Sequence, residues 1–242
     1  MRAAGRALAF AAACAPAALL AAHAAPASAL LPPGRLLFPA ITRAGTSDAV
    51  ALTFDDGPDV GLDAFLEVLE EYGARATFFV VGEQVARAPG RLKEILAGGH
   101  EVAVHCYRHC NHLLLTPGAT VEDMRRARGT IEEAAGCSPR LFRPPYGVFN
   151  LASWLEADRQ GWRRVLWARW GRDWEARATP RSVAETIGRP EAGDILLLHD
   201  SDRYAAPGSW RNTLGALPVI LDRLSSSGLR ARPAGELLDA GG

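Results

Sequence analysis

The chain has 242 residues, of which 48% are hydrophobic, and its 27 basic residues balance 27 acidic residues. Zero net charge excludes a broad basic field for nucleic acid, so no nucleic-acid partner is expected. The length is enough for one sizeable hydrophobic core and is within the range of a single α/β barrel.

The first residues have the pattern of an exported leader. A short basic segment precedes an apolar stretch over residues 7–22, and the tripeptide Ala-Ser-Ala at 27–29 has the small-x-small form of a cleavage site. We therefore expect a signal peptide over residues 1–29 and a protein that is secreted or associated with the cell envelope. Pro16 interrupts the short, alanine-rich stretch. No stable membrane span is therefore expected, and an uncleaved anchor is the less favoured alternative.

The rest of the chain alternates between strand-like and helix-like segments after a proline-rich linker or extended arm over residues 30–46. Short apolar runs predict strands at 49–54, 76–81, 101–105, 140–143, 164–168, 194–199 and 228–232. Periodic runs predict helices near 61–72, 89–97, 120–135, 149–160, 180–188 and 212–226, with Thr120 and Thr179 as N-caps. Repeated units of this kind favour one α/β domain with a parallel, barrel-like sheet inside a layer of helices.

Two carboxylates come directly after the first predicted strand. Asp55 and Asp56 stand in the string Thr-Phe-Asp-Asp-Gly-Pro at 53–58, which ends in a turn signal. Active sites of α/β folds gather at the carboxyl ends of parallel strands. Adjacent aspartates are by themselves more often a solvated turn or a helix cap. Together with the histidines below, they predict one carboxylate that binds an ion and one that acts as a base.

Two histidines follow the third predicted strand. His105 and His109 are four residues apart, and one helical turn would place both rings on the same face. Two imidazoles and one carboxylate leave positions open for water and substrate, as in catalytic zinc sites, although non-haem iron shares this ligand set. The sequence thus predicts a divalent metal site, with zinc as the expected ion. Cys106 and Cys110 follow the histidines. They suggest a rival thiolate zinc site, which is disfavoured because no second Cys-x-x-Cys pair exists.

Three later segments place further functional groups at strand ends. The string Leu-Phe-Arg-Pro-Pro-Tyr-Gly begins at residue 141, so a proline-stiffened loop fixes Arg143, although this string could be an ordinary turn. Three tryptophans and Asp173 fall within residues 167–174 and suit a platform for sugar rings as well as core packing. An apolar run that begins at residue 195 ends in His199. Each segment adds weight to a catalytic interpretation.

The order of these motifs resembles the polysaccharide deacetylases of the NodB-homology type, carbohydrate esterase family four, over about residues 47–238. The resemblance implies a distorted (β/α) barrel of about seven parallel strands, with residues 47–242 as the catalytic domain. It implies that Asp55 is the catalytic base and that Arg143 orients it. It also implies that His199 is the general acid and that Asp173 tunes its pKa. The metal ligands that it implies are Asp56, His105 and His109. It further implies substrate-binding roles for Tyr146, Pro144, Trp174 and Leu197. The Tyr146 N–H would hold the oxyanion, and Trp174 and Leu197 would receive the acetyl methyl.

Two positions depart from the family pattern. Cys106 stands where serine or threonine usually follows the first metal histidine, and Trp170 stands where the family often has an aspartate. The second change affects the shape of the substrate cleft more than the chemistry.

The function that the sequence favours is metal-dependent hydrolysis of N-acetyl groups on an amino-sugar glycan, either peptidoglycan or a chitin-like polymer. An O-acetyl esterase on a xylan-type glycan would use the same residues. A non-catalytic carbohydrate-binding protein of the same fold is the third alternative, but such a protein needs neither an acidic nor a basic catalytic group. The sequence does not indicate an oligomeric state.

Overall fold

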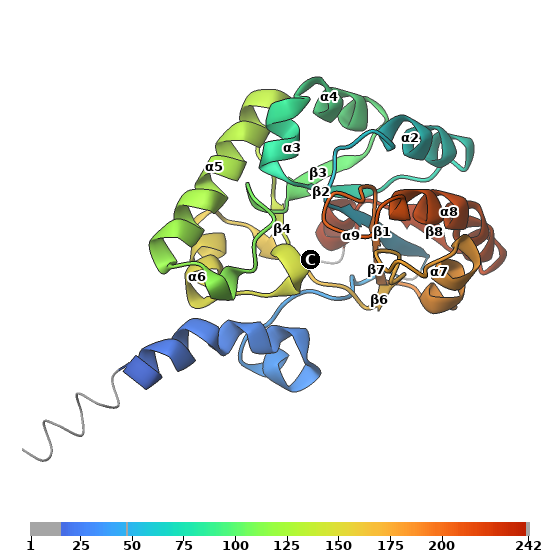
Figure 1. Ribbon diagram of the computed structural model, residues 1–242. Coiled ribbons are helices and arrows are strands. Elements are labelled where there is room, and N and C mark those ends of the chain that lie inside the picture. The colour runs from blue at the N-terminus through green and yellow to red at the C-terminus, as the bar shows by residue number, and fades with distance from the viewer. Residues whose placement is uncertain (1–15, 47, 241–242) are drawn as a thin grey trace, which may run out of the picture.

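The computed structural model describes residues 16–46 and 48–240, and its centre is a parallel sheet wrapped into a barrel (Figure 1). The strands follow the order β5-β4-β3-β2-β1-β7-β6, and β8 pairs with the first half of β1. Their bounds are β1 Ala49–Asp55, β2 Thr77–Val80, β3 Glu101–Val104, β4 Leu141–Phe142, β5 Arg163–Arg164, β6 Arg169–Trp170, β7 Ile195–His199 and β8 Arg230–Arg232. The predicted α/β barrel is confirmed.

Helices surround this sheet, and short 3-10 turns complete the loops. The α-helices are α2 Leu62–Glu71, α3 Gly82–Arg87, α4 Gly90–Ala97, α5 Pro117–Ala135, α6 Leu151–Arg159, α7 Pro180–Ile187, α8 Ser209–Ser226 and α9 Ala234–Ala240. The 3-10 turns are η1 Ala25–Leu30, η2 Pro32–Leu36, η3 His112–Leu114 and η4 Pro145–Gly147. Within the described ranges, none of the helices combines the length and the apolar character that a membrane crossing needs.

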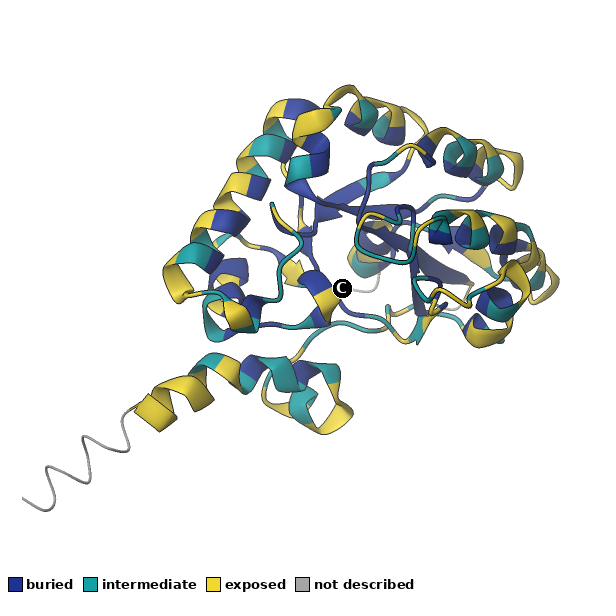
Figure 2. Ribbon diagram, viewed as in Figure 1, coloured by how far each residue is buried: buried dark blue, intermediate teal, exposed yellow. Residues whose placement is uncertain are grey.

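The alternation of side chains along each strand creates two cores. Val50, Leu52 and Phe54 of β1 face outward and pack against the helices. Ala49 and Ala51 face inward and pack with residues of the other strands inside the barrel. Small inward side chains suit a narrow barrel, whose interior is filled by the side chains themselves. In Figure 2 the central strands β1 and β2 are buried along their whole length, while the helices expose their outer faces.

One extended segment closes the barrel. β5 pairs with β4, and β6 pairs with β7, so residues 163–170 pass from one edge of the sheet to the other. We expected one strand over 164–168, but only the two ends of the segment form strands. The reason is that the central residues change partners, since Val165 N donates to Phe142 O and Ala168 N donates to Ile195 O.

The segment before β1 lies against the domain as an arm (Figure 1). Ile41 forms a parallel bridge with Val165, and the Phe38 ring packs edge-on against Trp154 at 5.3 Å between centroids. Ala29 is fully buried. Of the expected signal peptide, residues 1–15 lie outside the described part of the chain, and 16–24 form a helix. The domain boundaries and the cleavage site stay predictions.

The helix predictions hold apart from details at the ends. Thr179 caps α7 with a capping box, as expected, and Pro180 occupies the first helical position. α5 is capped by Thr116 and not by Thr120, because Pro117 can start the helix one turn earlier. The Thr120 hydroxyl instead donates to Thr116 O inside the helix. α3 and α9 are short and were missed.

Candidate metal centre and catalytic site

Strand alternation brings four of the expected site residues into the barrel mouth. Asp55 has the same parity as the inward Ala49 and Ala51, and it is the last residue of β1. By the same count, His105 follows inward Ala103, Arg143 follows inward Leu141, and His199 follows inward Ile195. Because all of these strands run parallel, the four side chains meet at the carboxyl end of the barrel.

Asp56, His105 and His109 form a compact cluster there. Asp56 Oδ1 lies 3.5 Å from His105 Nε2 and 3.3 Å from His109 Nε2, and the three ligand atoms lie within 4.8 Å of one another. The expected helical turn between the histidines is wrong, because residues 105–109 form an irregular loop in which Cys106 has a φ of 66°. This loop still brings the two imidazoles to 5.4 Å between ring centroids.

The donor atoms of this cluster fit a divalent cation. His105 Nδ1 lies 2.7 Å from Arg143 O, and since a carbonyl can only accept, Nδ1 carries the proton and leaves the Nε2 lone pair directed at the cluster. Asp56 Oδ1 is buried and has no hydrogen-bond partner among the described residues. Burial lowers the pKa of His109 to about 4, so its ring is neutral and can act as a ligand.

Asp56 is ready to bind a cation as a carboxylate. Burial acts to raise the pKa of Asp56, but the neighbouring His105 and the other imidazoles lower it to about 2. The side chain is therefore ionised across the neutral range. Its backbone φ of 84° lies in the left-handed region, which is uncommon for a residue other than glycine but which aspartate adopts more readily than most. All non-glycine positive φ values in the described chain are at or beside expected site residues: Asp56, Cys106, Tyr146 and Arg172.

Asp55 is held by a buried arginine. Arg143 is fully buried, and its NH1 donates to Asp55 Oδ1 at 2.6 Å and to Thr53 Oγ1 at 2.9 Å. Its NH2 donates to Leu166 O, and its guanidinium lies 4.0 Å from the centroid of the Phe79 ring. Burial lowers the pKa of Arg143, and the Asp55 carboxylate opposes this shift, so the guanidinium stays charged.

His199 is held by a buried aspartate. Asp173 Oδ1 lies 3.0 Å from His199 Nδ1, while its Oδ2 accepts from the His199 backbone N–H and from Thr213 Oγ1 at 2.7 Å each. Burial alone would lower the pKa of His199, but the charge and hydrogen bond of Asp173 raise it to about 10. The imidazole is therefore protonated at neutral pH, as a general acid must be.

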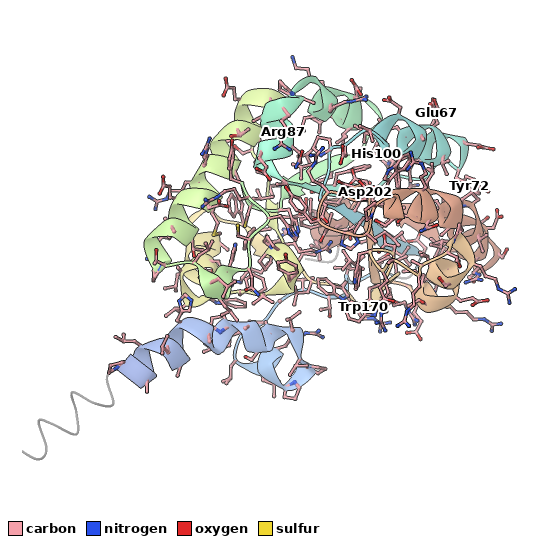
Figure 3. The ribbon with its side chains drawn as sticks, viewed as in Figure 1. Glu67, Tyr72, Arg87, His100, Trp170 and Asp202 are labelled. Atoms are coloured by element: carbon pink, nitrogen blue, oxygen red, sulfur yellow. The ribbon has the colours of Figure 1, made fainter. Side chains whose placement is uncertain are left out.

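Asp55, His199 and the Asp56–His105–His109 cluster line one cavity of about 240 Å³, whereas Arg143 and Asp173 are buried and do not line it. Its wall includes most of the expected residues, together with aromatic side chains from the barrel-closing segment and the loop after β7: Asp55, Asp56, His105, His109, Tyr146, Gly147, Trp167, Trp170, Trp174, Leu197, His199 and Tyr204. Trp170 is 42% exposed and lies at the edge of the molecule in the view of Figure 3. Tyr204 was missed by sequence reasoning, since a lone tyrosine in a polar loop carries no pattern.

The remaining expected substrate residues differ in exposure. Tyr146 is 57% exposed, and the neighbouring turn bonds, Gly147 N to Pro144 O and Val148 N to Pro145 O, do not use its N–H. Pro144 is buried and does not line the cavity. Its position suggests that it shapes the turn rather than contacting substrate.

The thiolate alternative finds no support in the geometry. Cys106 Sγ lies 3.0 Å from His112 Nε2, and both residues are buried, but neither belongs to the cluster of Asp56 and the two histidines. Burial raises the pKa of the Cys106 thiol well above its usual value, which disfavours the thiolate that zinc requires. Cys110 and Cys137 are also free thiols.

The fold and this cavity define a class of protein: a hydrolase of the (β/α) barrel type with a paired carboxylate, a paired imidazole and three residues that could hold a metal ion at the barrel mouth. Residues 42–165 match the family model described as polysaccharide deacetylase. The chain belongs to the polysaccharide deacetylase family, carbohydrate esterase family 4.

Individual relatives agree with this assignment. The chain is 35% identical to a peptidoglycan-N-acetylglucosamine deacetylase of Bacillus cereus over 193 residues, which is 78% of this chain and 87% of the relative. It is 31% identical to a chitooligosaccharide deacetylase of Bradyrhizobium over 78% of this chain and 90% of the relative. A family 4 carbohydrate esterase from Streptomyces lividans, solved in complex with acetate, superposes with a TM-score of 0.69 and 32% identity, covering 76% of this chain and 91% of that one.

Proposed function

We propose that the protein is an exported, metal-dependent deacetylase that hydrolyses N-acetyl groups of an amino-sugar glycan, with peptidoglycan as the leading candidate and a chitin-like polymer as the second. The observation that carries the proposal is that Asp55, His199 and the Asp56–His105–His109 cluster line one cavity. Buried Arg143 and Asp173 hold Asp55 and His199 from behind its wall. A glycan-binding protein without activity would have no use for a buried base and a protonated acid in the same cavity.

Asp56, His105 and His109 would hold the ion, with zinc as the expected metal. When bound, a divalent ion supplies Lewis acidity toward the acetyl carbonyl and lowers the pKa of a water molecule. Arg143 occupies Asp55 Oδ1, which leaves Oδ2, 3.8 Å from His105 Nε2, as the atom that would accept a proton from the attacking water. Arg143 thereby orients the base without taking both of its oxygens.

Tyr146 and His199 would act on the acetyl oxygen and on the leaving amine. The Tyr146 N–H would donate to the oxygen that becomes negative when water adds to the carbonyl. His199 holds its Nδ1 proton on Asp173, so the Nε2 proton is the one available to the departing amine. Trp174 and Leu197 line the same cavity and would surround the acetyl methyl. A cavity of this size suits an acetamido group with part of one sugar ring.

The test is acetate release by the purified protein. We expect release from peptidoglycan fragments and chitooligosaccharides, loss of activity with a chelator, and recovery on adding Zn²⁺. Release from acetylated xylan alone would favour the esterase alternative. Glycan binding without acetate release in the presence of metal would favour a carbohydrate-binding protein. Export is proposed from the leader sequence, and N-terminal sequencing of the protein from the cell envelope or medium tests it.

A further inference from the structure

The two metal-binding histidines are held in different ways. His105 has a conventional orienting partner, because its Nδ1 donates to Arg143 O at 2.7 Å. His109 Nδ1 is buried and has no hydrogen-bond partner in the described part of the chain. An imidazole without such a bond can rotate about its side-chain torsions, which would move Nε2 away from the cluster. Something else must therefore fix the plane of the His109 ring.

Two tyrosines enclose that ring. Tyr204 stacks on His109 with 4.3 Å between centroids and 13° between planes, and Tyr146 meets it edge-on at 4.7 Å and 64°. The parallel stack restricts rotation of the imidazole out of its plane, which an edge contact alone does less well. Since Tyr146 is 57% exposed, it is the less restrained of the two rings.

Tyr204 is itself anchored to α3. Its hydroxyl donates to Glu83 Oε1 at 2.5 Å and accepts from Gln84 Nε2 at 2.9 Å. Gln84 is buried, and its Oε1 accepts from Arg87, which Figure 3 labels on α3. Burial and the Glu83 carboxylate raise the pKa of Tyr204, so the hydroxyl stays protonated and remains a donor.

The same helix also holds the histidine loop. Gly82 N donates to Cys106 O, and Glu83 N donates to Tyr107 O, both at 2.9 Å. The loop after β7 is fixed in turn, since the Gly208 N–H donates to Asp202 Oδ2 and Ser201 Oγ donates to Asp59. Asp202 marks this loop in Figure 3. The ring of Tyr204 and the backbone of the histidine loop are thus both hydrogen-bonded to α3, which fixes their positions relative to each other.

We propose that Tyr204 is a positioning residue that holds the imidazole plane of His109 for metal binding, by ring stacking in place of the hydrogen bond that His105 has. The inference rests on the proposed metal site. It assigns to the loop after β7 a role in metal affinity, in addition to carrying the general acid at its start.

The experiment compares Tyr204→Leu, which removes the ring, with Tyr204→Phe, which keeps it. Zn²⁺ affinity of the metal-free proteins is measured by competition with a chromophoric chelator, and the absorption spectrum of the Co²⁺ form reports ligand geometry. We expect Tyr204→Leu to weaken Zn²⁺ binding about tenfold or more and to alter the Co²⁺ spectrum, with Tyr204→Phe much closer to wild type. Tyr72→Leu, far from the cavity, is the matched control.

Unchanged Zn²⁺ affinity and Co²⁺ spectrum in Tyr204→Leu would overturn the inference. Equal losses in both Tyr204 variants would also overturn it, because the hydroxyl anchor and not the stack would then matter. Thermal unfolding of the metal-free proteins identifies a variant that simply folds poorly, and in that case the comparison is made with Tyr204→Trp, which should retain affinity if stacking is the cause. If the wild-type protein binds no metal, the proposed site itself fails, which is a distinguishable result.

Discussion

Arg143 NH1 donates to Asp55 Oδ1 at 2.6 Å inside the barrel mouth, and both side chains are buried. The pair shows that two adjacent aspartates have different surroundings. Arg143 neutralises and orients Asp55, whereas Asp56 Oδ1 has no hydrogen-bond donor among the described residues and lies close to two imidazoles. The Asp55 carboxylate is thus paired with the guanidinium of Arg143, whereas the Asp56 carboxylate remains available to bind a metal ion.

Asp55→Asn should abolish most activity and keep the metal. The amide preserves the size of the side chain but cannot accept the proton of water, so we expect acetate release to fall about 100-fold or more. Metal content of the purified variant is the second measurement. A variant that loses its metal together with its activity would show that the roles of Asp55 and Asp56 are reversed.

Arg143→Met should destabilise the fold as well as remove activity. The substitution leaves the Asp55 carboxylate buried without its partner, and breaking a buried pair in this way costs about 3–5 kcal/mol. Denaturant unfolding measures the change in the free energy of unfolding. Arg181→Met is the control, because Arg181 is 88% exposed and its ion pair with Glu185 lies on the surface of α7. If both variants unfold at the same denaturant concentration, the Arg143 pair does not stabilise the barrel.

Asp173→Asn should shift the basic limb of the pH–rate profile to lower pH. Asp173 raises the pKa of His199 to about 10, so the acid stays protonated, and kcat should fall only as pH rises through that value. Without the carboxylate charge, the pKa of His199 falls, and the loss of the proton comes earlier. The measurement is kcat against pH from 6 to about 10.5. An unmoved basic limb would remove Asp173 from its proposed role.

His199→Ala should damage amide hydrolysis more than ester hydrolysis. An amine is a poor leaving group unless it is protonated, whereas an alkoxide on an activated ester leaves more readily. Rates on a chitooligosaccharide and on an activated acetyl ester, measured with the same preparation, give the comparison. Equal fold-losses on the two substrates would count against His199 as the proton donor.

Residues 25–29, at the end of the expected signal peptide, should stabilise the domain wherever they are retained. Pro26 and Ala29 are buried in η1, and Arg35 donates to Ala29 O and Leu30 O. A protein that begins at Leu30 loses these two buried residues, which corresponds to roughly 1–2 kcal/mol. We expect its Tm to lie a few degrees below that of a protein that begins at Ala25. Equal Tm values would show that the arm contributes nothing before Leu30.

Much of the site was predictable because it depends on position along parallel strands. Asp55, His105, Arg143 and His199 each stand at the end of a short apolar run, and the period of two places them on the inner face. Local sequence signals also predicted the cap and first turn of α7. Such features depend on residues close in the chain, so a single sequence contains them.

Other features depend on contacts between distant segments. No pattern near residue 204 shows that Tyr204 stacks on His109, because the contact joins the loop after β7 to the loop after β3. The irregular loop at 105–109 and the split strand at 163–170 also follow from their partners. The sequence by itself thus determined the parallel barrel, the strand-end positions of Asp55, His105, Arg143 and His199, and the resemblance to a family of deacetylases. Only the tertiary structure decided which side chains contact one another in the site, such as Tyr204 and His109. The reason is that packing, charge and hydrogen bonds act between residues that come together only when the chain folds.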